Sequence, residues 1–348
     1  MRHRFLALVP TLGTALLAAV CISGPALAAQ PAPSTPPAPF VVPAWAFPLA
    51  NPAGPVPPPD SVTLEHVPNS SRRYTRKQVG NGFDIPDWFP GQHPPMPASV
   101  QYGVRPDGRA CGFCHLPDGQ GRPENGALAG LPVEYTVRQV RAFRDGTRRS
   151  SHATVPSGPM HTVARGFASD DDVRAAARYF ARLRLTRRNV IREVRDVPKT
   201  RVAGLLYAYD GEGTEPIAGR LIEVPESLAR HELRDPWVRY VTYVPTGRVS
   251  RGRVLSTRGP AGAATACATC HGPQLLGVGE IPPIAGRSPS TVLRQLINFR
   301  TRARQDSTAA PMYAVTDALS LDDMVALSAY VGSLPPSARR TPSTATRK

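Results

Sequence analysis

An internal repeat constrains the fold of this chain of 348 residues more than any other feature. When the sequence is shifted by 156 positions, two Cys-x-x-Cys-His motifs superpose without a gap, and three residue pairs downstream superpose with them. The register then slips by four before a matched methionine, so one unit of about 80 residues occurs twice. The matched positions are Cys111, Cys114 and His115 with Cys267, Cys270 and His271; Ala129-Gly130 with Ala285-Gly286; Arg138-Gln139 with Arg294-Gln295; Phe143-Arg144 with Phe299-Arg300; and Met160 with Met312.

Each unit has helical periodicity after its cysteine motif. Apolar residues recur at helical spacing over residues 133–145 and again over residues 289–300. Ser288-Pro289 is typical of a helix start, with an N-cap followed by proline at the first helical position. A further helix closes each unit, and each begins with Ser-x-x-Asp, close to a capping box, at Ser169 and Ser320.

The segment 184–246 between the units differs in composition from both of them. Val202–Tyr209, Gly219–Val224 and Trp237–Val244 are rich in branched and aromatic residues, with glycine and proline between them. These runs predict a connector with short strands, and Gly247–Leu255 is expected to begin the second unit as a short helix.

The first 28 residues are typical of a secretory signal peptide. Arg2 and Arg4 precede the apolar run Phe5–Val20, and Ala26-Leu27-Ala28 forms a small-residue cleavage site. A membrane anchor is the alternative, but the run is short for one and no stop-transfer pattern follows. We therefore expect export to the periplasm, and cleavage would remove Cys21 and leave the four motif cysteines.

The remaining boundaries follow from composition. Residues 29–84 are expected to be a Pro-rich arm and an irregular N-terminal segment that buries little surface in its first part. Residues 85–183 and 247–335 are the expected domains, residues 184–246 their connector, and residues 336–348 a flexible basic tail.

The motif Cys-x-x-Cys-His is the signature of covalent c-type haem attachment. Two thiols add to the two vinyl groups of one porphyrin, and the adjacent histidine reaches the iron. A four-cysteine zinc site is the first alternative, but its pairs usually lie about 15–20 residues apart, far closer than Cys114 and Cys267. A thioredoxin-like redox pair is the second, and it needs neither the histidine nor a second copy. The sequence therefore predicts two covalently bound haems.

A haem iron that is closed to substrate needs a sixth ligand, and methionine is the usual partner of histidine. Met160 and Met312 lie in Gly-Pro-Met and Ala-Pro-Met, each before the last helix of its unit. We expect them to be the sixth ligands. His152 and His161 are rivals at the first haem, whereas Met324 is expected to be core and Met96 surface packing.

Residues beyond the ligands tune a haem through hydrogen bonds. Pro283 is the expected carbonyl acceptor for Nδ1–H of His271, and Ala127 is the matched position for His115. Four arginines recur on matched helices and are candidates for haem propionates, for the contact between domains, or for plain solvation: Arg138, Arg144, Arg294 and Arg300.

On these motifs the chain resembles di-haem cytochromes c built from tandem class I domains. The resemblance covers residues 85–183 and 247–335. It implies a mainly α fold, with two class I cytochrome c domains joined by a partly β or irregular connector. It also implies soluble or membrane-associated electron carriers whose irons have His/Met ligands: Cys111, Cys114, His115 and Met160 for one haem, and Cys267, Cys270, His271 and Met312 for the other. The long connector and the long N-terminal region depart from a simple tandem.

We therefore expect an exported one-electron carrier, not an enzyme, that works between periplasmic or membrane redox partners. The formal net charge of +16 favours acidic docking surfaces on those partners, and peripheral contact with a membrane complex is a further expectation. No motif suggests nucleic acid. Three alternatives stay open. They are a di-haem peroxidase, which needs one open iron; a thiosulfate-oxidising enzyme with a cysteine ligand, for which no cysteine is spare; and a dedicated electron-transfer subunit of a periplasmic dehydrogenase.

Overall fold

The computed structural model describes residues 40–50, 57–152, 158–167, 169–260 and 265–336. The expected signal peptide 1–28, Cys21 and the basic tail after Pro336 lie outside the described residues.

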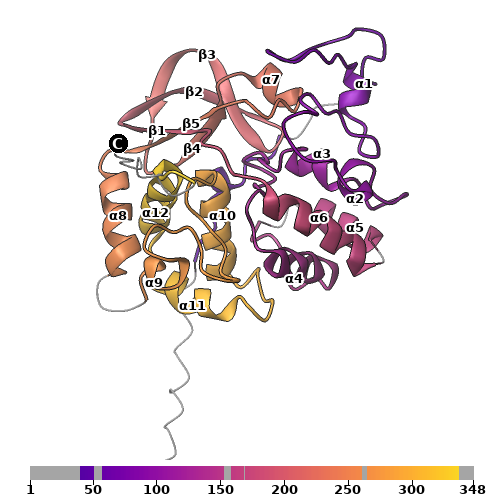
Figure 1. The fold of residues 1–348 in the computed structure, drawn as a ribbon. Helices are drawn as coiled ribbons and strands as arrows, with labels where there is room; N and C mark the ends of the chain where they lie inside the picture. Colours follow the sequence, from indigo (N-terminus) through magenta and orange to yellow (C-terminus); the bar gives the residue numbers. More distant parts are fainter. Residues whose placement is uncertain (1–39, 51–56, 153–157, 168, 261–264, 337–348) are drawn as a thin grey trace, which may run out of the picture. The chain divides into compact units, whose positions relative to one another are not determined.

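The first repeat folds into short helices (Figure 1), and these helices enclose small apolar clusters. Val137 of α4 packs with Val173 and Ala177 of α6, and the side chain of Cys111 lies against this cluster. A second cluster, around Val100 and Phe180, also includes Cys111 at its edge. The helices are α2 (Ala98–Gln101), α3 (Cys111–His115), α4 (Val133–Arg144), α5 (Gly158–Gly166) and α6 (Asp170–Arg182), preceded by the 3-10 turn η1 (Ala44–Ala46) and by α1 (Arg76–Val79).

The second repeat has the same helices in the same order. Leu293 and Ile297 of α10 pack against Met324 and Val325 of α12, and Cys267 lies at the edge of this cluster. The helix expected over Gly247–Leu255 is present and continues to Arg258. The helices are α8 (Arg248–Arg258), α9 (Cys267–His271), α10 (Pro289–Arg300), α11 (Ala310–Asp317) and α12 (Leu321–Ser333).

Side-chain caps fix the helix starts that the sequence indicates. Ser320 and Asp323 form a complete capping box at α12, each side chain bonding the backbone N–H of the other. The Ser288 hydroxyl accepts from the Thr291 backbone N–H at α10. At α6 the Ser169 hydroxyl accepts from the Asp171 N–H, so that start is capped without the reciprocal bond of a box.

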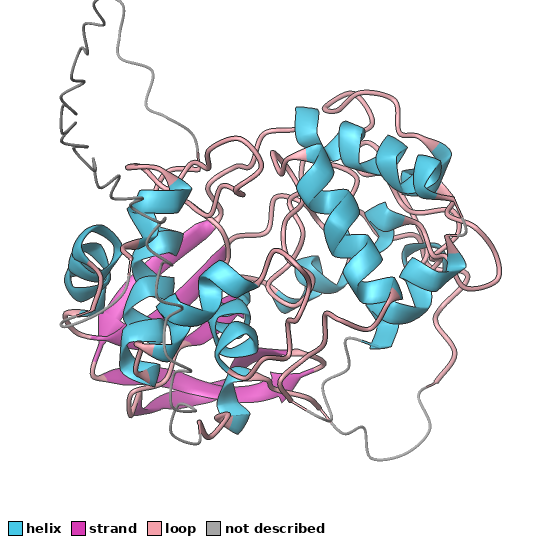
Figure 2. Ribbon diagram, turned by 90° about the horizontal axis from the view of Figure 1, so that it is seen from below, coloured by secondary structure: helices cyan, strands magenta, loops and turns pink. Residues whose placement is uncertain are grey.

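The connector forms two small sheets and one short helix (Figure 2). In the first sheet, β5 (Tyr240–Pro245) lies between β1 (Asn189–Val194), to which it is parallel, and β4 (Ile222–Pro225), to which it is antiparallel. The second sheet is a hairpin of β2 (Asp196–Ala203) and β3 (Leu206–Pro216). Helix α7 (Leu228–Glu232) follows β4.

The sequence correctly predicts short strands in the connector but misplaces one of them. Val202–Tyr209 is not one strand, because the chain turns at Gly204 and Leu205 between β2 and β3. Gly204 has φ +63, a conformation that interrupts an extended strand. Strand β1 was not expected from the composition.

The segment 40–50 lies against the second repeat instead of extending away from it. Ala46 and Phe47 are buried in the cluster formed by α10 and α12, and Arg294 of α10 donates from Nε to the Ala46 carbonyl at 2.7 Å. The composition predicts little burial in this segment, but its aromatic and small residues pack against an apolar surface of the second repeat. Within the described residues, no helix is both long and apolar enough to cross a membrane.

Helices α8 and α12 cross at Gly252, which has no room for a side chain. A Cβ there would lie 2.1 Å from the Ala326 carbonyl oxygen and 2.6 Å from the Tyr330 Cβ. We expect Gly252→Ala to lower the free energy of unfolding by about 1–3 kcal/mol, because the two backbones must separate. Denaturant unfolding measures this change.

Gly91→Ala is the matched control, since a Cβ at Gly91 meets nothing within 4 Å. Equal stability losses in the two variants would contradict the close helix crossing.

Candidate functional site

Each Cys-x-x-Cys-His motif forms a single helical turn, α3 in the first repeat and α9 in the second. All four thiols are free, and only Cys270 is exposed. Burial, and then the neighbouring Cys114, raise the pKa of Cys111 to about 12, and burial raises the pKa of Cys267 to about 11. These thiols are therefore neutral at pH 7, unlike the low-pKa thiolates of redox-active pairs. No group of three or more His, Cys, Asp or Glu among the described residues is arranged to hold a metal ion directly.

The histidine of each motif is held in the same way in both repeats. Nδ1 of His115 lies 2.9 Å from the Gly126 carbonyl oxygen, and Nδ1 of His271 lies 2.8 Å from that of Pro282. A carbonyl only accepts, so Nδ1 carries the proton and the lone pair is on Nε2. Burial lowers the pKa of both histidines, so both are neutral. Each ring thus has the tautomer and the charge of a metal ligand.

The acceptor is one residue earlier than the sequence indicates. Pro283 was the expected acceptor for His271 and Ala127 its match, but the bonds go to Pro282 and Gly126. The two acceptors still match each other under the shift of 156 positions, but both lie 11 residues after their histidine and not 12. Only the geometry of the turn decides which of two adjacent carbonyls faces the ring.

A glycine in each repeat lets the acceptor loop approach. A Cβ on Gly121 would lie 2.0 Å from the Gly126 carbonyl oxygen, and a Cβ on Gly277 would lie 2.6 Å from that of Ile281. Both glycines have positive φ. The close approach and the backbone conformation both require glycine here.

The two expected methionine ligands occupy matched helices. Met160 lies in the first turn of α5 and Met312 in the first turn of α11, and both are half-buried. Met312 packs against the same apolar cluster as Cys267. Met160 belongs to none of the apolar clusters formed by the described residues. The rival His161 is tied through Nε2 to the Arg148 carbonyl at 2.9 Å, and His152 stacks on Phe47.

Met96 is a neighbour of the first motif that the sequence did not reveal. It was expected to pack at the surface, but it is half-buried and packs on the clusters that contain Cys111 and Cys114. It precedes the motif by 15 residues in an irregular segment, so no periodicity indicates its contact.

The four recurrent arginines have protein partners. Arg144 donates to the Phe167 carbonyl and pairs with Asp170, so it joins α4 to the start of α6. Arg300 pairs with Asp317, so it joins α10 to the end of α11. Arg294 holds the segment 40–50. Arg138 reaches Glu280 of the other repeat at 3.3 Å, which is a contact between domains, one of the roles considered for this set.

The junction between the repeats is a pseudo-twofold hydrogen-bond network that the sequence analysis missed. The backbone N–H of Arg149 donates to the Ala303 carbonyl, and that of Gln305 donates to the Thr147 carbonyl. These two bonds exchange under the same shift of 156 positions. A signal was present, since Arg148 and Arg304 also match under that shift.

The side chains of the junction obey the same symmetry. Gln139 Oε1 accepts from Arg148 and from Arg304, each at 2.7 Å, and Gln295 Oε1 accepts from both at 3.1 Å. Burial, followed by repulsion from Arg304, lowers the pKa of Arg148 to about 9. Arg304 Nε and Gln139 Nε2 are buried without a hydrogen-bond partner. The junction therefore holds buried donors that the protein itself does not satisfy, whereas Asp306, 3.7 Å from Arg304, supplies a negative charge beside the guanidinium groups.

We expect Gln295→Leu to lower the free energy of unfolding by about 1–3 kcal/mol, because it leaves guanidinium donors of Arg148 and Arg304 without an acceptor. Denaturant unfolding followed by far-UV circular dichroism measures the change. Gln305→Leu is the control, since Gln305 is exposed and joins the junction only through its backbone. If both leucine variants lose the same stability, the side-chain network does not hold the repeats together.

A family model described as Cytochrome c matches residues 256–335, which includes the second motif, Met312 and α12. A cytochrome c-554(548) of Halomonas halodenitrificans (strain ATCC 12084 / NCIMB 8669) is 35% identical over 72 residues, 20% of this chain and 81% of that protein.

Longer matches cover about two thirds of the chain. A thiosulfate dehydrogenase electron acceptor of Stutzerimonas stutzeri (strain A1501) is 25% identical over 238 residues, 68% of this chain and 83% of that protein. Among solved structures, a thiosulfate dehydrogenase from Marichromatium purpuratum is similar with a TM-score of 0.42 and 26% identity. That match covers 66% of this chain and 37% of the other.

Proposed function

We propose, from the premise that the chain belongs to the cytochrome c family, that it is an exported electron carrier with one covalent haem c at each of its two motifs. Electron transfer, without substrate chemistry of its own, is the function of its relatives and of this chain. The second haem, the export, the ligand set and the partners are what the proposal adds.

The matched environment of the two motif histidines carries the proposal. His115 and His271 each donate Nδ1–H to a carbonyl 11 residues later, across a loop that needs glycine at the matched position. A repeat that had lost its haem would have no reason to keep a buried, neutral histidine with this orientation. When bound, a haem c supplies one-electron exchange between Fe(III) and Fe(II).

The residues around the motifs fit the group. Cys111 and Cys114 would hold the first haem and Cys267 and Cys270 the second, and apolar clusters adjoin Cys111 and Cys267. At the junction, the unpaired donors of Arg304 and Gln139 suit an anion, and haem carboxylates are the anions that this chemistry would bring. The protein's part is to orient the histidines, to exclude water and to compensate this charge.

Met160 and Met312 are the proposed sixth ligands, because they start matched helices after matched motifs. Met96 competes with Met160 at the first haem, since it packs against the same apolar clusters as the two cysteines of that motif.

We expect the oxidised protein to show the thioether-to-iron charge-transfer band for both haems. Met312→Ala is expected to remove the band of the second haem and to lower its potential, because methionine favours Fe(II). Met160→Ala is expected to do the same at the first haem. Near-infrared spectra combined with a potentiometric titration measure both effects.

Met324→Ala is the control, since Met324 is fully buried in the core of the second repeat. If Met160→Ala leaves the band intact and Met96→Ala removes it, the ligand at the first haem is Met96. A wild-type protein with only one low-spin haem would overturn the two-haem carrier and favour an enzyme with an open iron.

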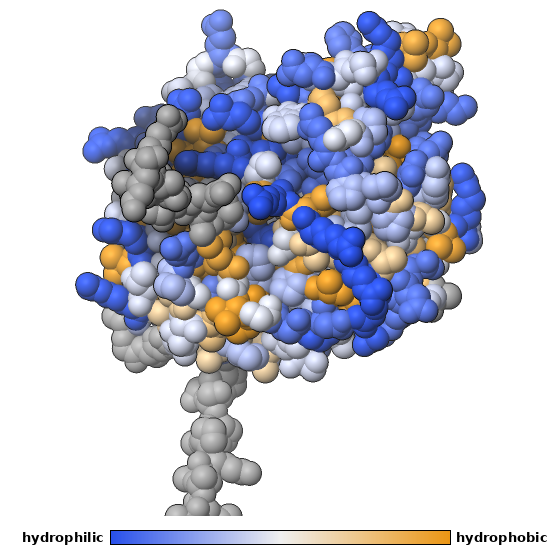
Figure 3. All heavy atoms as spheres, in the orientation of Figure 1, coloured by the Kyte–Doolittle hydropathy of each residue, from blue (hydrophilic) through white to orange (hydrophobic). Residues whose placement is uncertain are grey.

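The partners are proposed from the charge and from the relatives. The formal net charge is +16, and hydrophilic residues dominate the face shown in Figure 3, with only small apolar groups between them. An acidic docking surface on the partner complements such a face. Because a relative is named as the electron acceptor of a thiosulfate dehydrogenase, we propose a periplasmic dehydrogenase of that kind as the electron donor.

We expect the second-order rate of reduction by such a dehydrogenase to fall at least tenfold between about 0.01 M and 0.3 M salt, because screening weakens steering between opposite charges. Stopped-flow reduction measures the rate, with reduction by the neutral reductant hydroquinone as the control. A rate that is independent of salt would rule out steering by the basic surface. A complex that survives gel filtration would indicate a dedicated subunit and not a free carrier.

A further inference from the structure

The two repeats hold their acceptor carbonyls by different means. In the second repeat the acceptor belongs to Pro282 and Pro283 follows it, so two rings fix the φ angles of the loop. In the first repeat the matched pair is Gly126 and Ala127, and Gly126 has φ +67. Glycine permits many conformations, so covalent geometry alone does not hold this carbonyl against His115.

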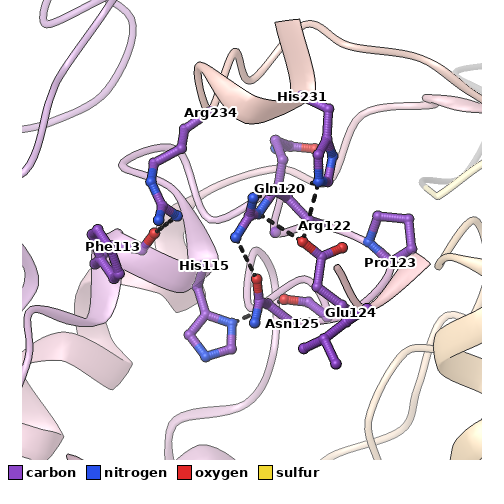
Figure 4. A network of polar contacts seen from close by, with 12 residues as sticks. Phe113, His115, Gln120, Arg122, Pro123, Glu124, Asn125, His231 and Arg234 are labelled. Carbon is purple, nitrogen blue, oxygen red and sulfur yellow. Dashed lines mark hydrogen bonds and ion pairs between the residues drawn. The ribbon is translucent and has the colours of Figure 1, made fainter. Parts of the chain in front are cut away.

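A buried polar network replaces the prolines in the first repeat (Figure 4). Arg122 donates from Nη2 to Asn125 Oδ1 at 3.0 Å, and its Nε lies 3.1 Å from Glu124 Oε1. The backbone N–H of Gly126 donates to the Arg122 carbonyl at 2.7 Å. The side chains of Arg122 and Glu124 therefore fix the loop whose last residue offers the acceptor.

The connector anchors this network from outside the repeat. Nε2 of His231, on α7, lies 3.4 Å from Glu124 Oε1, and Nδ1 of His231 lies 3.0 Å from the Tyr240 hydroxyl on β5. Arg188, just before β1, donates to the Gln120 and Gly121 carbonyls. Each of these anchors lies in the segment 184–246, which a simple tandem of two haem domains lacks.

The buried carboxylate of Glu124 depends on its polar partners in the network. The side chains of Glu124 and His231 are only 7% and 6% exposed. Burial by itself raises the pKa of Glu124, but Arg122 and His231 outweigh it and lower that pKa to about 2. A buried carboxylate is tolerated only with such partners, so removal of one member releases the others.

We propose that the connector, acting through Arg122, Glu124 and His231, positions the Gly126 carbonyl, and that this contact sets the hydrogen bond of His115 and the potential of the first haem. The inference rests on the proposed function, since it takes His115 as an iron ligand. The three side chains are positioning residues. A firm Nδ1–H bond makes the imidazole a stronger donor and favours Fe(III), so a looser loop raises the potential.

The test is Glu124→Gln in the haem-loaded protein. We expect solvent exchange of the His115 Nδ1–H, followed by NMR in the reduced state, to become at least tenfold faster. At a fixed solution potential near the midpoint, we expect the Fe(II)/Fe(III) ratio of the first haem to rise at least threefold. The His271 Nδ1–H and the second haem serve as internal references and are expected to stay unchanged.

Arg122→Gln separates positioning from simple electrostatics. Loss of a positive charge stabilises Fe(III) and lowers the potential if only the field matters, whereas a loosened hydrogen bond raises it. We expect the potential to rise in both variants. Opposite shifts in the two variants, or unchanged exchange of the His115 Nδ1–H, would overturn the proposal.

Glu232→Gln is the matched control. It makes the same change of charge on α7, next to His231, but Glu232 is half exposed and pairs with Arg76 at the surface. If Glu124→Gln fails to fold, His231→Gln takes its place in the same two measurements. This variant removes the contact between the connector and Glu124 but leaves the pair of Glu124 and Arg122 intact. Normal exchange in a folded, loaded His231→Gln protein would overturn the role of the connector. Failure of the proposed function can be told apart from failure of this inference, because the wild-type protein would then lack a haem at Cys111 and Cys114.

Discussion

The hydrogen bond from Nδ1 of the motif histidine to a carbonyl 11 residues later is the constraint around which each repeat is built. It fixes the tautomer of His115 and His271 and directs Nε2 away from the loop. The loop in turn must approach the motif helix, which requires glycine at 121 and 277. The remaining helices of each repeat bury the apolar side of the motif turn and so keep it in place.

The junction between the repeats follows from their duplication. Two copies of one surface that meet around a pseudo-twofold axis place each residue opposite its own match, as Arg148 and Arg304 show. Two guanidinium groups that meet in this way repel each other, and two glutamine carbonyls compensate for only part of this charge. Asp306, which lies 3.7 Å from Arg304, adds a negative charge to the junction.

The sequence predicts the periodic and chemically specific features well and the non-local ones poorly. The motif turns, the caps at Ser288 and Ser320 and the repeat itself depend on residues near one another, so spacing reveals them. Strand β1 pairs with β5 across about 50 residues, and its composition carries no signal of that pairing. The contact of Met96 with the first motif and the choice of Pro282 over Pro283 depend on turn geometry, which residue types alone do not determine.

One difference between the repeats lies next to the histidines that we propose as iron ligands. Two haem sites that arise from one duplicated unit start with the same surroundings and therefore with the same reduction potential. Electrons would move in a set direction between the two haems only if these potentials differ. The histidines, the cysteines and the loop glycines are the same in both copies, so the difference must come from residues around them. Such a difference is present. One copy has Pro282-Pro283, and the other has Gly126 with a network that is anchored in the connector. Under our proposal the connector is a part of the first site, because its contacts with Glu124 and with the Gln120 and Gly121 carbonyls take the place of the two prolines of the second repeat.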